Sequence, residues 1–175
     1  MMTDTNKNLY NLDELSDYKV AENYSDVRGW YVKDANKRII GTVDHLLVNK
    51  IAERVVYLDV EVDKTLIEEG YNMYQKSVSE GVHEFLNKDG DNHVIIPIGM
   101  ATIEENNKVV TTNQIDSSTF AKAKRFRKGD AIDFEYELNL VRHYRGDKTI
   151  HSSNTVEGFY EREEFNNTVN RKNLE

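Results

Sequence analysis

Two apolar segments in close succession constrain the fold more than any other feature of the sequence. The first, residues 39–48, carries apolar side chains on both faces of an extended strand. Val43 and Leu47 lie on one face, and Leu46 and Val48 lie on the other. A strand that is buried on both faces is typical of a closed or wrapped sheet. The sequence therefore predicts a mainly β fold built around this strand.

The second segment, Arg54 to Val62, alternates strictly between apolar and polar positions. Such a period of two indicates a strand with one buried and one exposed face. The valines at its even positions and Leu58 form the buried face. We expect Tyr57, Asp59 and Glu61 to point the other way, toward solvent or a partner.

Two further hairpins are predicted from their turn residues. In residues 82–98 the turn contains Asp89-Gly90, a pair that accepts the positive φ angles of tight hairpins. In residues 100–113 the turn is Asn106-Asn107, and asparagine tolerates the same left-handed conformation. The intervening residues 63–81 are expected to form a long loop, which is where function often resides.

The pattern changes after Asp116. Ser117 or Ser118 can cap a helix that continues through Arg125. Residues 132–144 are ambiguous, because their apolar side chains recur at every second position, as in a strand, and at every fourth, as in a helix. Their length and their content of Glu and Leu favour a helix slightly. We expect one or two helices after the sheet.

Composition limits the classes of function. The chain of 175 residues has no cysteine, which removes disulfides, thiol nucleophiles and thiolate metal sites. Its net charge of −8 repels phosphate backbones, so no nucleic-acid partner is expected from the chain as a whole. Residues 1–20 contain no apolar run and no segment is long enough to span a membrane, so we expect no signal peptide, no membrane insertion and a cytoplasmic location.

No pattern of catalytic or metal-binding residues emerges. The histidines are His45, His83, His93, His143 and His151. They lack metal-ligand spacing. The register expected for the 82–98 hairpin places His83 and His93 on opposite faces, so these two cannot share a metal ion. Pairs of acidic residues fall in turns or polar segments, where solvated carboxylates are the rule. Phosphate-binding glycine motifs are absent from the sequence. We therefore predict no catalytic residue, no metal, no cofactor and no enzymatic activity.

Two groups of residues are candidates for contacts with other molecules. The first is an interaction surface made of Tyr57, Asp59, Glu61, Tyr71, Met73 and Tyr74. Tyrosine and methionine are enriched at interfaces, although such residues also cover cores. The second is an anion contact made of Lys122, Lys124, Arg125, Arg127 and Lys128, with Phe126 among them. The alternative for this second group is a helix C-terminus whose cations complement the helix dipole.

The chain resembles the PRC-barrel family. Residues 26–34 match the family's opening pattern D-x-x-G-x-x-V-x-D, and residues 40–46 match I-G-x-V-x-x-L. Strands similar to the family's later ones follow in order at residues 55–60, 94–98 and 101–110. A weaker similarity to the cytoplasmic part of the photosynthetic reaction-centre H subunit continues to Tyr144. In that family a helix follows the barrel, which supports a helix at 132–144.

The resemblance implies a small antiparallel β-barrel or twisted sheet and a habit of docking on proteins. The expected organisation is an N-terminal hook (1–21), a PRC-barrel-like domain (22–115), a packed helical segment (116–145) and a flexible tail (146–175). The expected function is a non-catalytic interaction or assembly module that binds a protein partner or forms a homo-oligomer. The alternatives are an H-subunit-like accessory in photosynthetic electron transfer and an RNA- or ribosome-associated factor acting through residues 122–128.

Overall fold

The fold is mainly β with a smaller α part, as the sequence predicts. The computed structural model describes residues 9–15, 26–50, 52–66, 92–112, 114–121, 123–128, 130–145, 160 and 163–165. Its strands are β1 (Tyr10–Asn11), β2 (Tyr31–Lys33), β3 (Ile39–Asn49), β4 (Arg54–Val62), β5 (His93–Pro97), β6 (Thr102–Glu104) and β7 (Val109–Thr111). Its helices are η2 (Leu12–Glu14), η3 (Ile98–Met100), α2 (Ser117–Ala121), α3 (Phe134–Arg145) and η4 (Glu163–Phe165), where η denotes a 3-10 helix.

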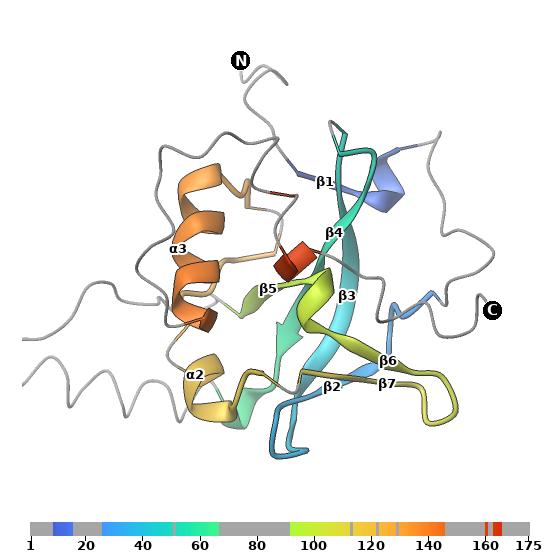
Figure 1. The fold of residues 1–175 in the computed structure, drawn as a ribbon, viewed down its shortest axis with the longest axis vertical. Helices are drawn as coiled ribbons and strands as arrows, with labels where there is room; N and C mark the ends of the chain where they lie inside the picture. Colours follow the sequence, from blue (N-terminus) through green and yellow to red (C-terminus); the bar gives the residue numbers. More distant parts are fainter. Residues whose placement is uncertain are drawn as a thin grey trace, which may run out of the picture.

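The described strands form one twisted sheet in the order β5-β4-β3-β2-β7-β6, with β1 added beside β3. Neighbouring strands pair antiparallel except for β2 and β7, which run parallel. The long β3–β4 ribbon forms the spine of the sheet, and α3 packs beside it on the side away from β6 and β7 (Figure 1). The two ends of the strand order, β5 and β6, are not paired with each other, so the sheet is twisted and open.

Irregular positions in β3 bend the spine. A bulge at Ile40 lies where β3 passes β2, because Val32 pairs with Gly41 and Lys33 pairs with Ile39. A second bulge inserts Asp44 between the paired residues Val43 and His45. A bulge bends and twists its strand and redirects a side chain, which lets one ribbon wrap around the core.

The core lies inside the wrap of the sheet and continues beneath the helices. Fully buried side chains from five strands meet there: Val32, Ile40, Val60, Ile96 and Val110. Residues 9–12 pack against this core, with β1 paired to β3 and with Leu9 and Leu12 buried. The hairpin predicted at 100–113 is confirmed, since β6 and β7 pair antiparallel.

The helical segments differ in how well the sequence located them. The helix expected at 132–144 is confirmed as α3, and Asp133 caps it by accepting a hydrogen bond from the Tyr136 backbone N–H at 2.8 Å. The helix expected from Ser117 to Arg125 ends at Ala121 instead. Its cap is Asp116, whose carboxylate accepts the Thr119 N–H at 2.8 Å, rather than a serine.

Some expectations fall outside the described residues. They include the 63–81 loop beyond Leu66 and the 82–91 part of the second hairpin, of which β5 is the described strand. Within the described part of the chain, no helix is both long enough and apolar enough to cross a membrane.

Candidate interaction surface

The outer face of β4 is mostly covered, which corrects the predicted interaction surface. Tyr57 has no exposed surface and Asp59 is 5% exposed, whereas Glu61 is exposed as expected. Helix α3 and Tyr160 lie over the Tyr57 end of this face. The expectation that Tyr57 and Asp59 face solvent is wrong. The alternation of a strand indicates which residues share a face, but it does not indicate whether another segment covers that face. Tyr71, Met73 and Tyr74 lie outside the described residues.

Tyr57 belongs to a buried hydrogen-bonded cluster. Its hydroxyl donates to Oε1 of Glu137 at 2.8 Å, and the Tyr160 hydroxyl donates to the same oxygen at 2.5 Å. Glu137 lies on α3 and has no exposed surface. Burial, followed by the nearby Glu137 carboxylate, raises the pKa of Tyr57 well above its ordinary value. The cluster therefore holds β4, α3 and the region of Tyr160 together with Tyr57 as a neutral donor.

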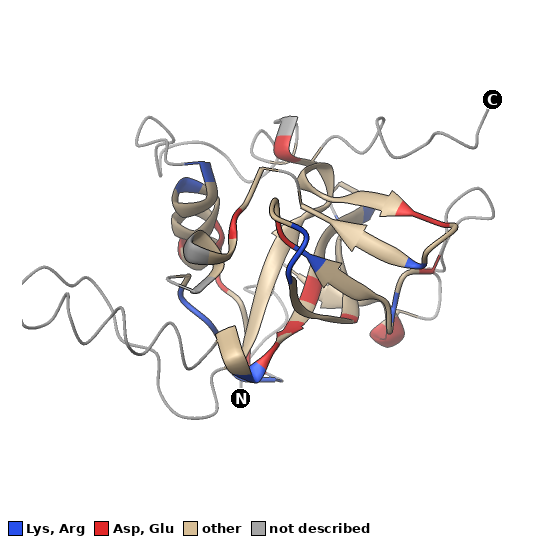
Figure 2. Cartoon of the chain, turned by 90° about the horizontal axis from the view of Figure 1, so that it is seen from below, with Lys and Arg blue, Asp and Glu red and all other residues tan. Residues whose placement is uncertain are grey.

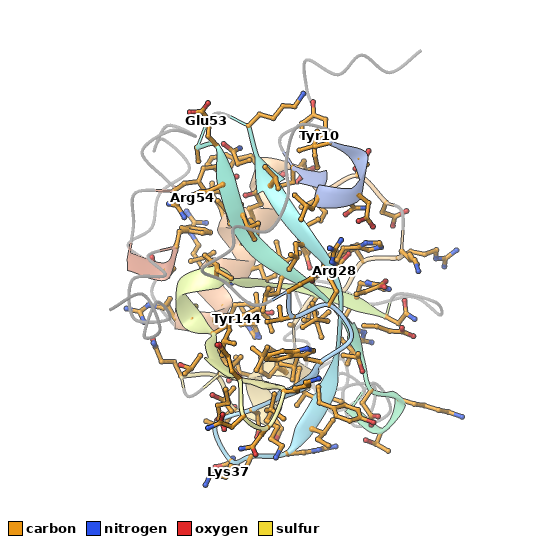
Figure 3. The ribbon with its side chains drawn as sticks, turned by 90° about the vertical axis from the view of Figure 1, so that its right-hand side faces the viewer. Tyr10, Arg28, Lys37, Glu53, Arg54 and Tyr144 are labelled. Carbon is orange, nitrogen blue, oxygen red and sulfur yellow. The ribbon has the colours of Figure 1, made fainter. Side chains whose placement is uncertain are left out.

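We call Tyr160 and Glu163–Phe165 together the C-terminal strap. Arg54, at the start of β4, donates to the backbone carbonyls of Tyr160 at 2.6 Å and Phe165 at 2.8 Å. Figure 3 shows Arg54 at the upper part of β4, well separated from the Lys37 turn. Arg145, the last residue of α3, pairs with Glu164 at 3.0 Å. Tyr160 and Phe165 are buried, so the expected looseness of the tail does not extend to the strap.

A second polar cluster lies farther along the same face of the sheet. Nδ1 of His93 lies 2.7 Å from Oδ1 of Asp59, and both residues are buried. Because of the second bulge in β3, Asp44 also faces this point, and its Oδ2 lies 3.8 Å from His93 Nε2 and 3.6 Å from His45 Nε2. Lys128 approaches the same oxygen at 3.4 Å. The arrangement brings polar side chains of β3, β4 and β5 together.

This cluster offers no metal centre. Among the described residues, no group of three or more histidine, aspartate or glutamate side chains is arranged to hold a metal ion. The hydrogen bond to Asp59 occupies one nitrogen of His93, and the Lys128 ammonium already supplies a cation beside Asp44. His83, the other histidine of its hairpin, lies outside the described residues.

The basic segment does not form one exposed row of cations. Arg125 is 2% exposed, and Lys128 makes the ion pair with Asp44. Lys124, Arg127 and Lys128 are exposed, while Lys122 lies outside the described residues. Phe126 packs its ring on His93, and its backbone pairs with the same residue, which closes the β5 edge. Acidic and basic residues are interspersed along the described chain (Figure 2).

The exposed apolar side chains lie elsewhere on the sheet. Tyr31 is 55% exposed and Ile39 is 42% exposed, and they are the exposed large hydrophobic residues of the described part of the chain. Tyr31 pairs with Thr42, which pairs with Glu61, while Ile39 pairs with Lys33. Paired residues share a face, so these five residues form one outer surface, which we call the β2–β3 patch.

Sequence reasoning identified only Glu61 of this patch. Tyr31 lies within the apolar run of residues 30–32, and Ile39 begins the next apolar run. In such runs a side chain in the core and one on the surface have the same local pattern. The signal that could have found them is the alternation with Val32 and Ile40, both of which are fully buried. The bulge at Ile40 obscures this alternation, because it shifts the register by one residue.

No curated protein matches the sequence significantly. The PRC-barrel domain family matches residues 19–118, which include β2 to β7 and the start of α2. Since this match covers more than half of the sequence, the chain belongs to the PRC-barrel family.

Proposed function

We propose that this chain is a non-catalytic protein-interaction or assembly module that docks through the β2–β3 patch. The observation that supports the proposal most directly is the exposure of Tyr31 and Ile39 on one outer surface of an otherwise well-buried sheet. The proposed partner is a protein, which can be either another protein or a second copy of this chain.

The chemistry of the β2–β3 patch suits a protein surface. Tyrosine provides a large contact area with few rotatable bonds, and it is enriched at the centres of interfaces. Lys33 and Glu61 place opposite charges beside the apolar pair, which favours a partner with a mixed polar rim. Diagonal neighbours on antiparallel strands lie within reach of an aromatic side chain, so Tyr31 and Ile39 can contact one apolar residue of a partner together.

The test is capture of partners from source-cell lysate by the full chain and by two variants, Tyr31→Glu and Ile39→Glu. Each variant places a carboxylate at the centre of the patch. We expect each to weaken binding of the captured protein by about 30-fold, the effect of losing about 2 kcal/mol at a hot spot. Affinity is then measured by calorimetry with the purified partner, or by sedimentation if the partner is the chain itself.

Asn139→Glu is the matched control, because it adds the same charge at an exposed position of α3 outside the patch. This variant is expected to bind like the unmodified chain. Binding that survives both patch substitutions would show that the patch is not the docking surface. An empty capture together with a monomeric mass at high concentration would contradict the proposal of an assembly module.

A narrower role in RNA or ribosome binding has less support from the described residues. It requires the cations of segment 122–128 to face a phosphate backbone, yet Arg125 is buried and Lys128 pairs with Asp44. Nucleic acid captured at low salt and released at high salt would favour this role. The role as an H-subunit-like accessory in photosynthetic electron transfer rests on family membership, and it predicts capture of reaction-centre proteins.

A further inference from the structure

The C-terminal strap is bound to the rest of the chain in the manner of a peptide ligand. Arg54 holds the strap through its main chain, by donating to the carbonyl oxygens of Tyr160 and Phe165. The rigid, planar guanidinium of Arg54 therefore donates hydrogen bonds to two backbone carbonyls of the strap. We call the surface beneath the strap, formed by β4, η3 and α3, the strap groove.

Two aromatic anchors fill the strap groove. Tyr160 is 1% exposed and Phe165 is fully buried, and their ring centroids lie 5.1 Å apart. Both rings also meet Tyr57 edge to face, at 6.5 Å from Tyr160 and 5.2 Å from Phe165. Aromatic residues in a desolvated pocket are the usual energetic anchors of an interface.

One ion pair fixes the orientation of the strap in the groove. Oε2 of Glu164 lies 3.0 Å from Nε of Arg145, and the Glu164 side chain is 1% exposed. A buried carboxylate without its cation costs free energy, so this ion pair favours the position in which Glu164 lies beside Arg145.

We propose that the strap groove also accepts the strap of a second copy of this chain, so that two copies associate by exchanging straps. The described contacts join the strap to residues 54, 57, 137 and 145, and residues 146–159 connect it to α3. A strap from another copy can form the same contacts, and exchange of an identical element is a low-cost route to a dimer. This inference concerns a different surface from the β2–β3 patch and does not depend on it.

The test uses two full-length variants, Arg145→Glu and Glu164→Arg. Within each single variant the strap and its own groove carry like charges, which disfavours the internal arrangement. When the two variants are mixed, each groove can receive an oppositely charged strap from the other copy. We expect a heterodimer in the equimolar mixture, measured by native mass spectrometry and light scattering, at a population at least about tenfold above that of either variant alone.

The control is the double variant Arg145→Glu with Glu164→Arg, in which the ion pair is restored within one copy. It is expected to form no more dimer than the unmodified chain does. A mixture of the two single variants that remains the sum of its separate components would overturn the proposal.

A second measurement uses the unmodified chain, so that misfolding of a variant cannot obscure the result. A labelled peptide with the sequence of residues 158–168 is expected to bind only weakly, because the attached strap competes at an effective concentration of about a millimolar. The same peptide with Tyr160→Ala and Phe165→Ala is expected not to bind. Equal binding of the two peptides, or no binding of either at millimolar concentration, would overturn the proposal.

Discussion

Glu137 lies on α3 without exposed surface, and its Oε1 accepts hydrogen bonds from the hydroxyls of Tyr57 and Tyr160. Each tyrosine comes from a segment far from Glu137 in the chain, and neither stands in a motif that marks it as a donor. The sequence favours a helix at Glu137 only slightly, and it gives no sign that the Glu137 carboxylate is buried. Such pairings arise from tertiary packing, and local periodicity cannot reveal them.

Replacing Tyr57 by Phe removes one of these donors. We expect the free energy of unfolding to fall by about 2 kcal/mol, because a buried acceptor loses a hydrogen bond. The check is urea denaturation of the variant and the unmodified chain. Tyr31→Phe is the control, since its exposed hydroxyl should leave the free energy of unfolding within about 0.5 kcal/mol of its original value.

The comparison of Tyr57→Phe with the unmodified chain also predicts how the free energy of unfolding depends on pH. The pKa of Tyr57 is raised by burial and by Glu137, and burial also raises the pKa of Tyr144. In the unfolded chain tyrosine loses its proton near pH 10, at about its ordinary pKa, whereas the folded chain keeps it. Stability is therefore fully present below about pH 10 and is lost as the pH rises further. Tyr57→Phe should lose stability less steeply between pH 10 and 11, and identical slopes would contradict this account.

Individual strands and helices were largely predictable, while their partners were not. The β6–β7 hairpin was located from its turn, although its left-handed residue is Lys108 rather than an asparagine. Periodicity left α3 open between strand and helix, and its length and its content of Glu and Leu favoured the helix. The parallel pairing of β2 with β7 joins residues 31–33 to residues 109–111, and no local pattern marks strands that meet over such a distance. The surface of the sheet was likewise mislocated, because α3 and the C-terminal strap cover Tyr57.

Gly41 allows β3 to lie close to β4. A Cβ atom added at this position would overlap the carbonyl oxygen of Glu61 and lie 2.9 Å from Cγ1 of Val60. We expect Gly41→Ala to destabilise the chain by about 3 kcal/mol, since backbone atoms must move apart to admit the methyl group. Urea denaturation measures this effect.

Gly29 provides the matched comparison for Gly41. Its φ is +89°, yet a Cβ added there would have no neighbour within 4 Å. Gly29→Ala should therefore cost only the strain of a positive φ, about 1–2 kcal/mol. A larger loss of stability at Gly29 than at Gly41 would show that backbone conformation, rather than close approach of strands, limits this part of the sheet.

On the scale of the whole molecule, one side chain connects the start of β4 to the C-terminal strap. The hydrogen bonds from Arg54 span 106 positions to Tyr160 and 111 positions to Phe165. Family resemblance predicted the sheet and the helix after it, but it contained no counterpart of this contact. Segments outside the matched family pattern must be located by structure, because the resemblance says nothing about how they pack.

Arg54→Ala should release the strap while leaving the sheet folded. We expect amide hydrogen exchange in residues 160–165 to accelerate by about 30-fold, since two hydrogen bonds from a charged donor together contribute about 2 kcal/mol or more. The exchange rate in Arg54→Lys should fall between the rates of the unmodified chain and of Arg54→Ala, because an ammonium lacks the planar fork that reaches both carbonyls. Hydrogen exchange followed by mass spectrometry measures the rates, and β3 serves as the internal reference. Unchanged exchange in Arg54→Ala would show that the aromatic anchors alone hold the strap.

The parallel pairing of β2 with β7 also has a consequence for the synthesis of the protein. A ribosome makes residues 31–33 long before residues 109–111, so one edge of β2 has no strand partner until β7 is made. The strap is made later still, and until it leaves the ribosome Glu137 has only one of its two tyrosine donors. β7 later supplies the second neighbour of β2, and the C-terminal strap later supplies the second tyrosine donor to Glu137.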